Sequence, residues 1–156
     1  MVLKISSAAL HNILARAAAS PEAEVCGLLL GEEMQVTQTV ACANVAASPA
    51  DSFEIDPAAL IAAYRSARTG GAAVIGHYHS HPSGGPEPSL RDRAQAMGDG
   101  AIWLIVAQGR FTAWVSRSAG RLSAIDVMAD GGGCAMAPAS PEGRAEALLN
   151  VSKALD

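Results

Sequence analysis

The stretch A-A-V-I-G-H-Y-H-S-H-P, residues 72–82, decides the architecture around it. Residues 72–75 form a short apolar run, which is typical of a buried strand. Three histidines, His77, His79 and His81, follow at alternate positions in this strand or just beyond it. Because alternate residues of a strand point to the same face, we expect the imidazoles to share one side of a sheet. The stretch therefore predicts a buried strand whose end carries polar chemistry.

A loop and a helix are predicted after this strand. Residues 82–88 contain three prolines and two glycines, which is typical of a loop with a restricted backbone. Ser89 can cap a helix over residues 90–97, which Gly98 closes. Asp92 falls in the first turn of that helix, where a carboxylate interacts favourably with the helix dipole. Ser89 and Asp92 are thus expected near the end of the histidine strand.

The rest of the chain alternates between strand and helix patterns. Strands are predicted over residues 2–5, 25–30, 34–43, 101–107, 110–117 and 121–127, and helices over residues 7–19, 57–68 and 141–155. Gln108-Gly109 predicts a tight turn between two of the strands. Such a hairpin argues for a mixed sheet and against a purely parallel one. We therefore predict an α/β fold with a mixed central sheet flanked by helices.

Length and composition bound the domain organisation. The chain has 156 residues, enough for one domain with an ordinary hydrophobic core. Hydrophobic residues make up 50% of it and charged residues 17%, which excludes a disordered or coiled-coil chain. We predict one folded domain over residues 1–128. Residues 129–156 are predicted to form a linker rich in glycine and proline and a C-terminal helical tail.

Charge and cysteine content exclude several classes of partner. The net charge is −4 and no basic run occurs, so neither nucleic acid nor an anionic membrane surface is an expected partner. No apolar stretch reaches the ~18 residues of a membrane span, and charged residues interrupt the apolar N-terminus, unlike a signal peptide. Cys26, Cys42 and Cys134 are an odd number without C-x-x-C spacing, which predicts free thiols and a cytoplasmic protein.

The histidines and the nearby carboxylate indicate a metal site. Neutral imidazole is a good zinc ligand, and two imidazoles on one strand face can reach one cation. Two histidines with Asp92 leave a fourth tetrahedral position open, as in a catalytic site. The spacing allows His77 with His79 as the ligand pair as well as His79 with His81, and a weak adventitious site is the alternative. Glu24, at the head of the upstream apolar strand, is a candidate general base.

These residues also match a composite motif. It reads H-S-H at residues 79–81, seven further residues, and S-L-R-D at residues 89–92, with Glu24 before V-C-G-L-L-L-G upstream. In this pattern the chain resembles the JAMM (MPN-plus) zinc metallopeptidases, and in particular their small stand-alone prokaryotic members, over residues 2–127. The resemblance implies a cytidine-deaminase-like JAMM/MPN architecture for the α/β fold.

The resemblance also implies roles for five residues. His79, His81 and Asp92 would hold one Zn²⁺ per chain. Glu24 would be the general base, and Ser89 would help to stabilise the developing oxyanion, roles that agree with the chemistry of these side chains.

His77 precedes the implied ligands by two residues, where larger relatives often carry tryptophan. We interpret it as a residue that packs behind the ligands, with substrate contact as the alternative. Nucleobase deamination is excluded, because that class needs H-x-E and P-C-x-x-C motifs, and the sequence contains neither.

The function implied by the resemblance is hydrolysis of a peptide or isopeptide bond. The implied substrate is the C-terminal Gly-Gly tail of a ubiquitin-like or sulfur-carrier protein. A narrow groove would suit such a tail, because glycine lets a backbone approach closely on both sides. The alternatives are a non-catalytic JAMM-like scaffold that binds partner proteins, and a metallopeptidase that acts on an unrelated phage-tail or cell-wall peptide.

Overall fold

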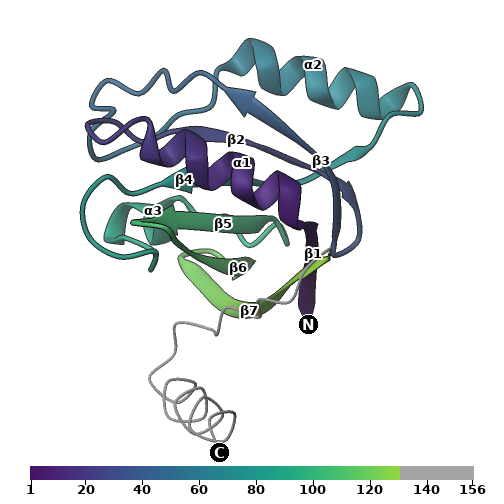
Figure 1. Ribbon diagram of the computed structural model, residues 1–156. Coiled ribbons are helices and arrows are strands. Elements are labelled where there is room, and N and C mark those ends of the chain that lie inside the picture. The colour runs from purple at the N-terminus through teal and green to yellow at the C-terminus, as the bar shows by residue number, and fades with distance from the viewer. Residues whose placement is uncertain (131–156) are drawn as a thin grey trace, which may run out of the picture.

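The strands form a single mixed sheet that curls into a closed barrel, shown in Figure 1. The structure is a computed structural model and describes residues 1–130. The strands are β1 (Val2–Ser6), β2 (Cys26–Glu32), β3 (Gln35–Cys42), β4 (Ala73–Ser80), β5 (Ile102–Ala107), β6 (Arg110–Ser118) and β7 (Arg121–Asp130), and the helices are α1 (Ser7–Ala18), α2 (Pro57–Arg68) and α3 (Leu90–Gln95). Around the barrel the order is β1-β3-β2-β4-β5-β6-β7. Parallel pairs (β1 with β3, β1 with β7, β4 with β5) occur among antiparallel ones, which confirms the predicted mixed sheet.

Local sequence chemistry begins and ends the elements as predicted. The side chain of Asp56 accepts a hydrogen bond from the backbone N–H of Ala58 at 3.0 Å and so caps α2. Gln108 and Gly109 both have positive φ, 51° and 73°, which gives the tight turn expected between β5 and β6. The start of α2 and the turn between β5 and β6 were therefore located correctly.

Several predicted ends were wrong by one to three residues, and two of them have a clear structural cause. The helix predicted over residues 90–97 ends at Gln95, because Ala96 already has an extended backbone. The strand predicted to end at residue 127 continues to Asp130, because residues 126–130 pair with β1. Apart from the end of this strand, the predicted linker and tail over residues 129–156, with Cys134, lie outside the described residues.

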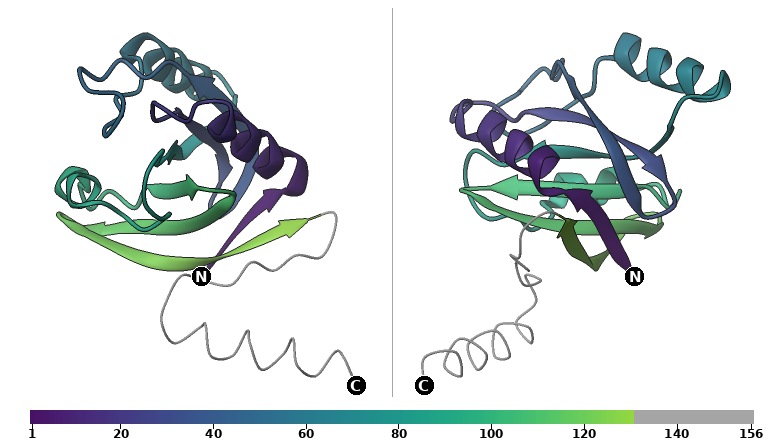
Figure 2. Two further views of the ribbon diagram at one scale, coloured as in Figure 1. Left: turned by 60° about the vertical axis from the view of Figure 1, so that its left-hand side comes forward. Right: turned by 45° about the vertical axis from the view of Figure 1, so that its right-hand side comes forward.

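The main core lies on the concave side of the sheet. Leu10 and Ile13 on one face of α1 pack into the same buried cluster as Leu29, Tyr78 and Leu104 from the central strands. Both views in Figure 2 show α1 lying across the curved sheet. Burial of such side chains supplies the dominant favourable term in folding. The helix therefore contributes side chains to the core as well as covering the sheet.

Close packing between β2 and β4 fixes the register that the site needs. Gly27 pairs with Tyr78, and a Cβ added at Gly27 would clash with the tyrosine ring. Only glycine therefore lets the Tyr78 ring pack at this position. The Tyr78 hydroxyl accepts a hydrogen bond from Arg16 at 3.0 Å. This register places Cys26 opposite His79.

The convex side of the sheet is covered more loosely. No residue of α2 is fully buried, although Leu60 and Ala63 contact a small cluster around Leu28 and Leu30. Cys26 and Cys42 are buried free thiols on neighbouring strands. None of the helices within residues 1–130 is long and apolar enough to cross a membrane.

Candidate metal centre and its groove

The end of β4 delivers two histidines to one place. β4 lies between β2 and β5, so its backbone is held from both sides. His79 lies within the strand and is fully buried. His81 follows the strand, where its backbone N–H donates to the Val106 carbonyl at 2.9 Å. The side chains of His79 and His81 thus converge, as the alternation predicted.

The start of α3 delivers the carboxylate. Ser89 is the N-cap residue, and its hydroxyl accepts from the backbone N–H of Asp92 at 3.1 Å. In return, Asp92 Oδ2 accepts from the Ser89 backbone N–H at 2.8 Å, so the two residues form a capping box. The cap predicted from the sequence therefore also holds the Asp92 carboxylate. The Ser89 hydroxyl keeps its own proton available for donation.

The three donor groups converge closely enough to hold a metal ion. His79 Nε2 lies 3.1 Å from His81 Nε2 and 3.1 Å from Asp92 Oδ1. His81 Nε2 lies 3.2 Å from Asp92 Oδ2. Ligand atoms about 2.0–2.1 Å from a tetrahedral zinc lie about 3.3 Å from one another. The donor set and its spacing therefore fit zinc.

Hydrogen bonds set the protonation of these groups. His81 Nδ1 lies 2.8 Å from the Gly85 carbonyl, which can only accept, so Nδ1 carries a proton and Nε2 is the nitrogen that can bind a metal. Burial opposes the charged form of His81, but its bonds to Asp92 and Gly85 raise its pKa. Burial lowers the pKa of His79. The pKa of Asp92 is held far below its usual range, because hydrogen bonds from both histidines outweigh burial.

Glu24 enters the site from the start of β2. It is buried, and its Oε2 atom has no hydrogen-bond partner among the described residues. Burial raises the pKa of Glu24 to about 7, while His81 opposes the shift and Asp92 adds to it. A carboxylate with a pKa near neutrality is suited to taking up and releasing protons.

Asn44 fixes the segment around Glu24, and sequence reasoning missed it. Its amide N–H₂ donates to the carbonyls of Glu24 and Ser52, both at 3.0 Å. Its Oδ1 accepts from the backbone N–H groups of Ala46 and Glu54, also at 3.0 Å. In the sequence this segment shows only small residues of a loop, and no pattern marks an asparagine that will make four bonds.

The loop that Asn44 holds places an aromatic ring on the site. The ring of Phe53 stacks on that of His79, with centroids 4.3 Å apart and planes 16° apart. His77 packs edge-on against Trp103 at 4.3 Å, and burial lowers its pKa to about 3. Within the described part of the chain, the converging group contains His79, His81 and Asp92. His77 lies outside it, so the structure does not assemble the alternative ligand pair.

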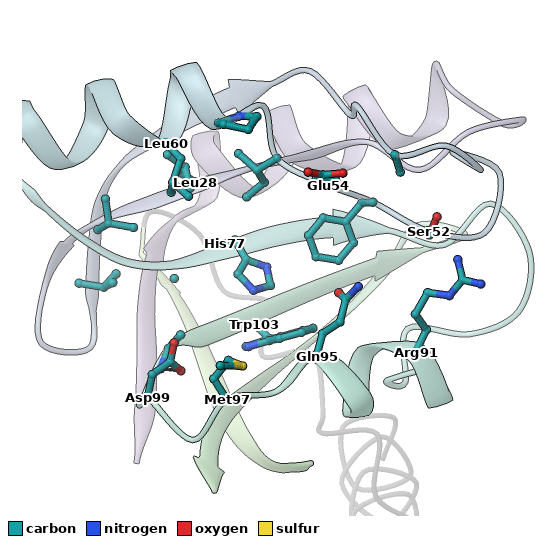
Figure 3. A pocket seen from close by; sticks show the side chains of 18 of the residues that line it. Leu28, Ser52, Glu54, Leu60, His77, Arg91, Gln95, Met97, Asp99 and Trp103 are labelled. Carbon is teal, nitrogen blue, oxygen red and sulfur yellow. Dashed lines mark hydrogen bonds between the residues drawn. The ribbon is translucent and has the colours of Figure 1, made fainter. Parts of the chain in front are cut away.

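An open groove of about 1280 Å³ lies beside this site along β4 (Figure 3). Its floor contains His77 and Trp103, and Leu28 and Leu60 line the side towards α2. Arg91, next to Asp92 in sequence, lies at one end. The donor residues do not line the groove themselves, but Phe53, which stacks on one of them, does. The groove therefore adjoins the donor group on the convex face of the sheet.

A family model described as prokaryotic homologs of the JAB domain matches residues 6–118. The chain belongs to this family. It is 38% identical over 118 residues to the desampylase of Haloferax volcanii, covering 71% of this chain and 85% of that protein. It is 31% identical over 96 residues to the probable TtuB-protein conjugate cleaving protease of Thermus thermophilus, covering 62% of this chain and 64% of that protein.

Solved structures share the fold. A protein from Desulfitobacterium hafniense matches with a TM-score of 0.71 and 22% identity, over 85% of this chain and 94% of that one. A JAB1/MPN domain protein from Archaeoglobus fulgidus matches with a TM-score of 0.52 and 22% identity, over 81% of this chain and 96% of that one. The JAMM/MPN architecture expected from the sequence is confirmed.

Proposed function

We propose that this JAB-family protein is a zinc-dependent isopeptidase that cleaves after the C-terminal Gly-Gly tail of a ubiquitin-like or sulfur-carrier protein. The observation that carries the proposal is the convergence of His79, His81 and Asp92 donor atoms near the buried carboxylate of Glu24, whose Oε2 atom has no hydrogen-bond partner within residues 1–130. Similarity to a desampylase and to a protease named for cleaving protein conjugates supports it.

His79, His81 and Asp92 would hold one Zn²⁺ through the two Nε2 atoms and the carboxylate. A bound zinc ion supplies Lewis acidity and lowers the pKa of water in its coordination sphere. The protein's own contribution is rigidity. His79 is held within β4 and stacked against Phe53, His81 is fixed by Gly85, and Asp92 by the capping box.

Glu24 and Ser89 would perform the proton transfer and charge stabilisation. Glu24 takes a proton from the attacking water and returns it to the leaving amine, which requires a pKa near the working pH. The Ser89 hydroxyl accepts from Asp92 N and can donate its proton to the oxyanion that develops on the scissile carbonyl.

The groove would receive the extended tail of the carrier. Glycine at the last two positions lets the tail's backbone approach the floor without a Cβ clash. Longer side chains further from the cleaved bond would contact Leu28 and Leu60 on the α2 side. We place the reaction in the cytoplasm, which the free thiols of Cys26 and Cys42 on neighbouring strands support.

The test is a cleavage assay with ubiquitin-like carriers extended by a short peptide beyond their Gly-Gly. The zinc-loaded protein is incubated with each carrier, and mass spectrometry identifies the products. We expect cleavage after the second glycine. Glu24→Gln should lower the rate by about 10²–10⁴-fold while zinc content stays at one ion per chain.

Glu22→Gln is the matched control, because it removes an exposed carboxylate two residues away. It should retain the wild-type rate. Equal rates for Glu24→Gln and wild type would exclude Glu24 as the base. Intact carriers in the presence of zinc-loaded protein would contradict the proposed substrate class, and failure to bind zinc would contradict the metal centre itself.

A further inference from the structure

We propose that Thr112 and Trp114 of β6 are positioning residues that set the orientation of the His81 ring through the loop of residues 82–88. The inference rests on the proposed function only in taking His81 as a metal ligand. Neither residue touches the donor group. They act on it through the carbonyls of Gly85 and Pro86.

Trp114, Thr112 and the loop form a hydrogen-bonded relay with a fixed direction. Trp114 Nε1 lies 2.7 Å from Thr112 Oγ1, and the indole N–H can only donate. Thr112 Oγ1 lies 2.5 Å from the Pro86 carbonyl oxygen, which can only accept. The threonine hydroxyl therefore accepts from the indole and donates to Pro86. Hydrogen bonds chained in this way polarise one another.

The relay ends one peptide unit from the carbonyl that accepts the hydrogen bond of His81. The Gly85 carbonyl accepts from His81 Nδ1 at 2.8 Å, and the next carbonyl, that of Pro86, accepts from Thr112. Pro86 is fully buried, and its ring restricts the backbone φ between the two carbonyls. A shift of the Pro86 carbonyl therefore moves the acceptor of His81.

The loop has few other anchors. Among the described residues, His81 and Thr112 provide the only side chains that hydrogen bond to residues 82–88. Ser83, Gly84 and Glu87 are exposed. Thr112 is thus the link between the middle of this loop and the barrel wall, and the barrel wall is rigid because β6 pairs on both sides.

The consequence concerns the metal-binding atom of His81. While Nδ1–H is donated to Gly85, the ring is oriented so that Nε2 points towards His79 and Asp92. Partners that fix the other nitrogen of a ligating histidine tune metal affinity, and their loss costs about 10–100-fold. Thr112 contacts the loop and not His81 itself, so loss of its hydroxyl should lower metal affinity by an amount near the lower end of that range.

The test compares four variants of the full-length protein. Thr112→Val removes the hydroxyl and keeps the shape, and Thr112→Ser restores the hydroxyl. Trp114→Phe removes the indole donor. Ser116→Ala is the matched control, because Ser116 is a buried hydroxyl on the same strand that accepts from Gly98 at 2.8 Å, away from His81.

Two measurements are made on each variant. Zinc affinity is measured by competition with a chromophoric chelator. The hydrogen bond from His81 Nδ1–H to Gly85 is read from the ¹H chemical shift of that proton in the metal-free protein, and circular dichroism checks that each variant folds. We expect Thr112→Val to weaken zinc binding about tenfold and to shift this proton upfield, because the bond to Gly85 lengthens. Trp114→Phe should shift both readouts less, and Thr112→Ser and Ser116→Ala should remain within about twofold of the wild type.

Wild-type affinity and an unchanged Nδ1–H shift in folded Thr112→Val would overturn the proposal. Equal losses in Thr112→Val and Ser116→Ala would overturn it too, because the effect would then be general destabilisation. If the wild type itself bound no zinc, the proposed function would fail. The Nδ1–H shift of His81 in metal-free wild type and Thr112→Val would still decide whether the relay exists.

Discussion

The two faces of β4 have different roles. On the concave face, Tyr78 packs under α1 and accepts a hydrogen bond from Arg16. On the convex face, His77 lines the open groove, and His79 joins the donor group. One strand of alternating residues thus supports the fold with one set of side chains and the chemistry with the other.

The helices on the two faces differ in the same way. α1 inserts Leu10 and Ile13 into the main core, whereas no residue of α2 is fully buried. Loose cover leaves the groove accessible beside the donor group. Substitutions on the α1 side should therefore change stability, and substitutions on the convex side should change metal binding or activity.

The largest effect is expected from His79→Ala, which removes a ligand from the convex face. Zinc affinity should fall by more than about 100-fold, because even indirect partners of a ligand account for 10–100-fold. Activity should be lost with it, while the circular dichroism spectrum remains that of a folded protein. Titration with zinc against a chelator measures the change. His11→Ala, on the exposed side of α1, is the control and should bind zinc normally.

Next in size is Ile13→Ala on the concave face. Ile13 is 2% exposed in the main core, and truncating such a residue costs about 2–5 kcal/mol in the free energy of unfolding. Denaturant titration measures this loss. Zinc affinity of the molecules that remain folded should be unchanged. A parallel loss of affinity under folding conditions would show that the two faces are coupled.

What the sequence predicted depends on how local the cause is. Some features depend only on residues that are close in sequence, and the structure has them where they were expected. They are the caps Ser89 and Asp56, the turn at Gln108-Gly109 and the spacing of His79, His81 and Asp92. Closure of the barrel was not predicted. It depends on backbone pairing of β1 with β7, more than 100 residues apart, and such hydrogen bonds carry little residue specificity.

The supporting residues of the site were missed for a similar reason. Thr112 and Asn44 are ordinary polar residues in a strand and a loop, and their partners are distant in sequence. His77 was interpreted as a packing residue, and its contacts with Trp103 and Phe53 agree with that interpretation. It also lines the groove, so substrate contact stays an open prediction.

Glu24 should make stability depend on pH. Burial raises its pKa from an ordinary value near 4.5 to about 7, so the folded state holds a proton that the unfolded chain has released between these values. The contribution of Glu24 to the stability of the metal-free protein should therefore fall by up to about 3 kcal/mol as pH rises from 4.5 towards 7.5. Burial lowers the pKa of His77 and His79, and these groups contribute in the opposite direction, so the fall is measured as the stability of the wild type minus that of Glu24→Gln. Denaturant midpoints across this pH range measure it, and parallel curves for the two proteins would contradict the buried, protonated carboxylate.

The smallest effect is expected from Ile61→Ala on α2, and it tests the comparison most directly. Ile61 has the same side chain as Ile13 but is 52% exposed, so its truncation leaves no buried cavity. Surface substitutions of this kind change the free energy of unfolding by about 0.5 kcal/mol or less. The same denaturant titration that measures Ile13→Ala measures this variant. A cost near that of Ile13→Ala would mean that α2 packs as tightly as α1, and loose cover would then no longer explain why the groove opens on the convex face.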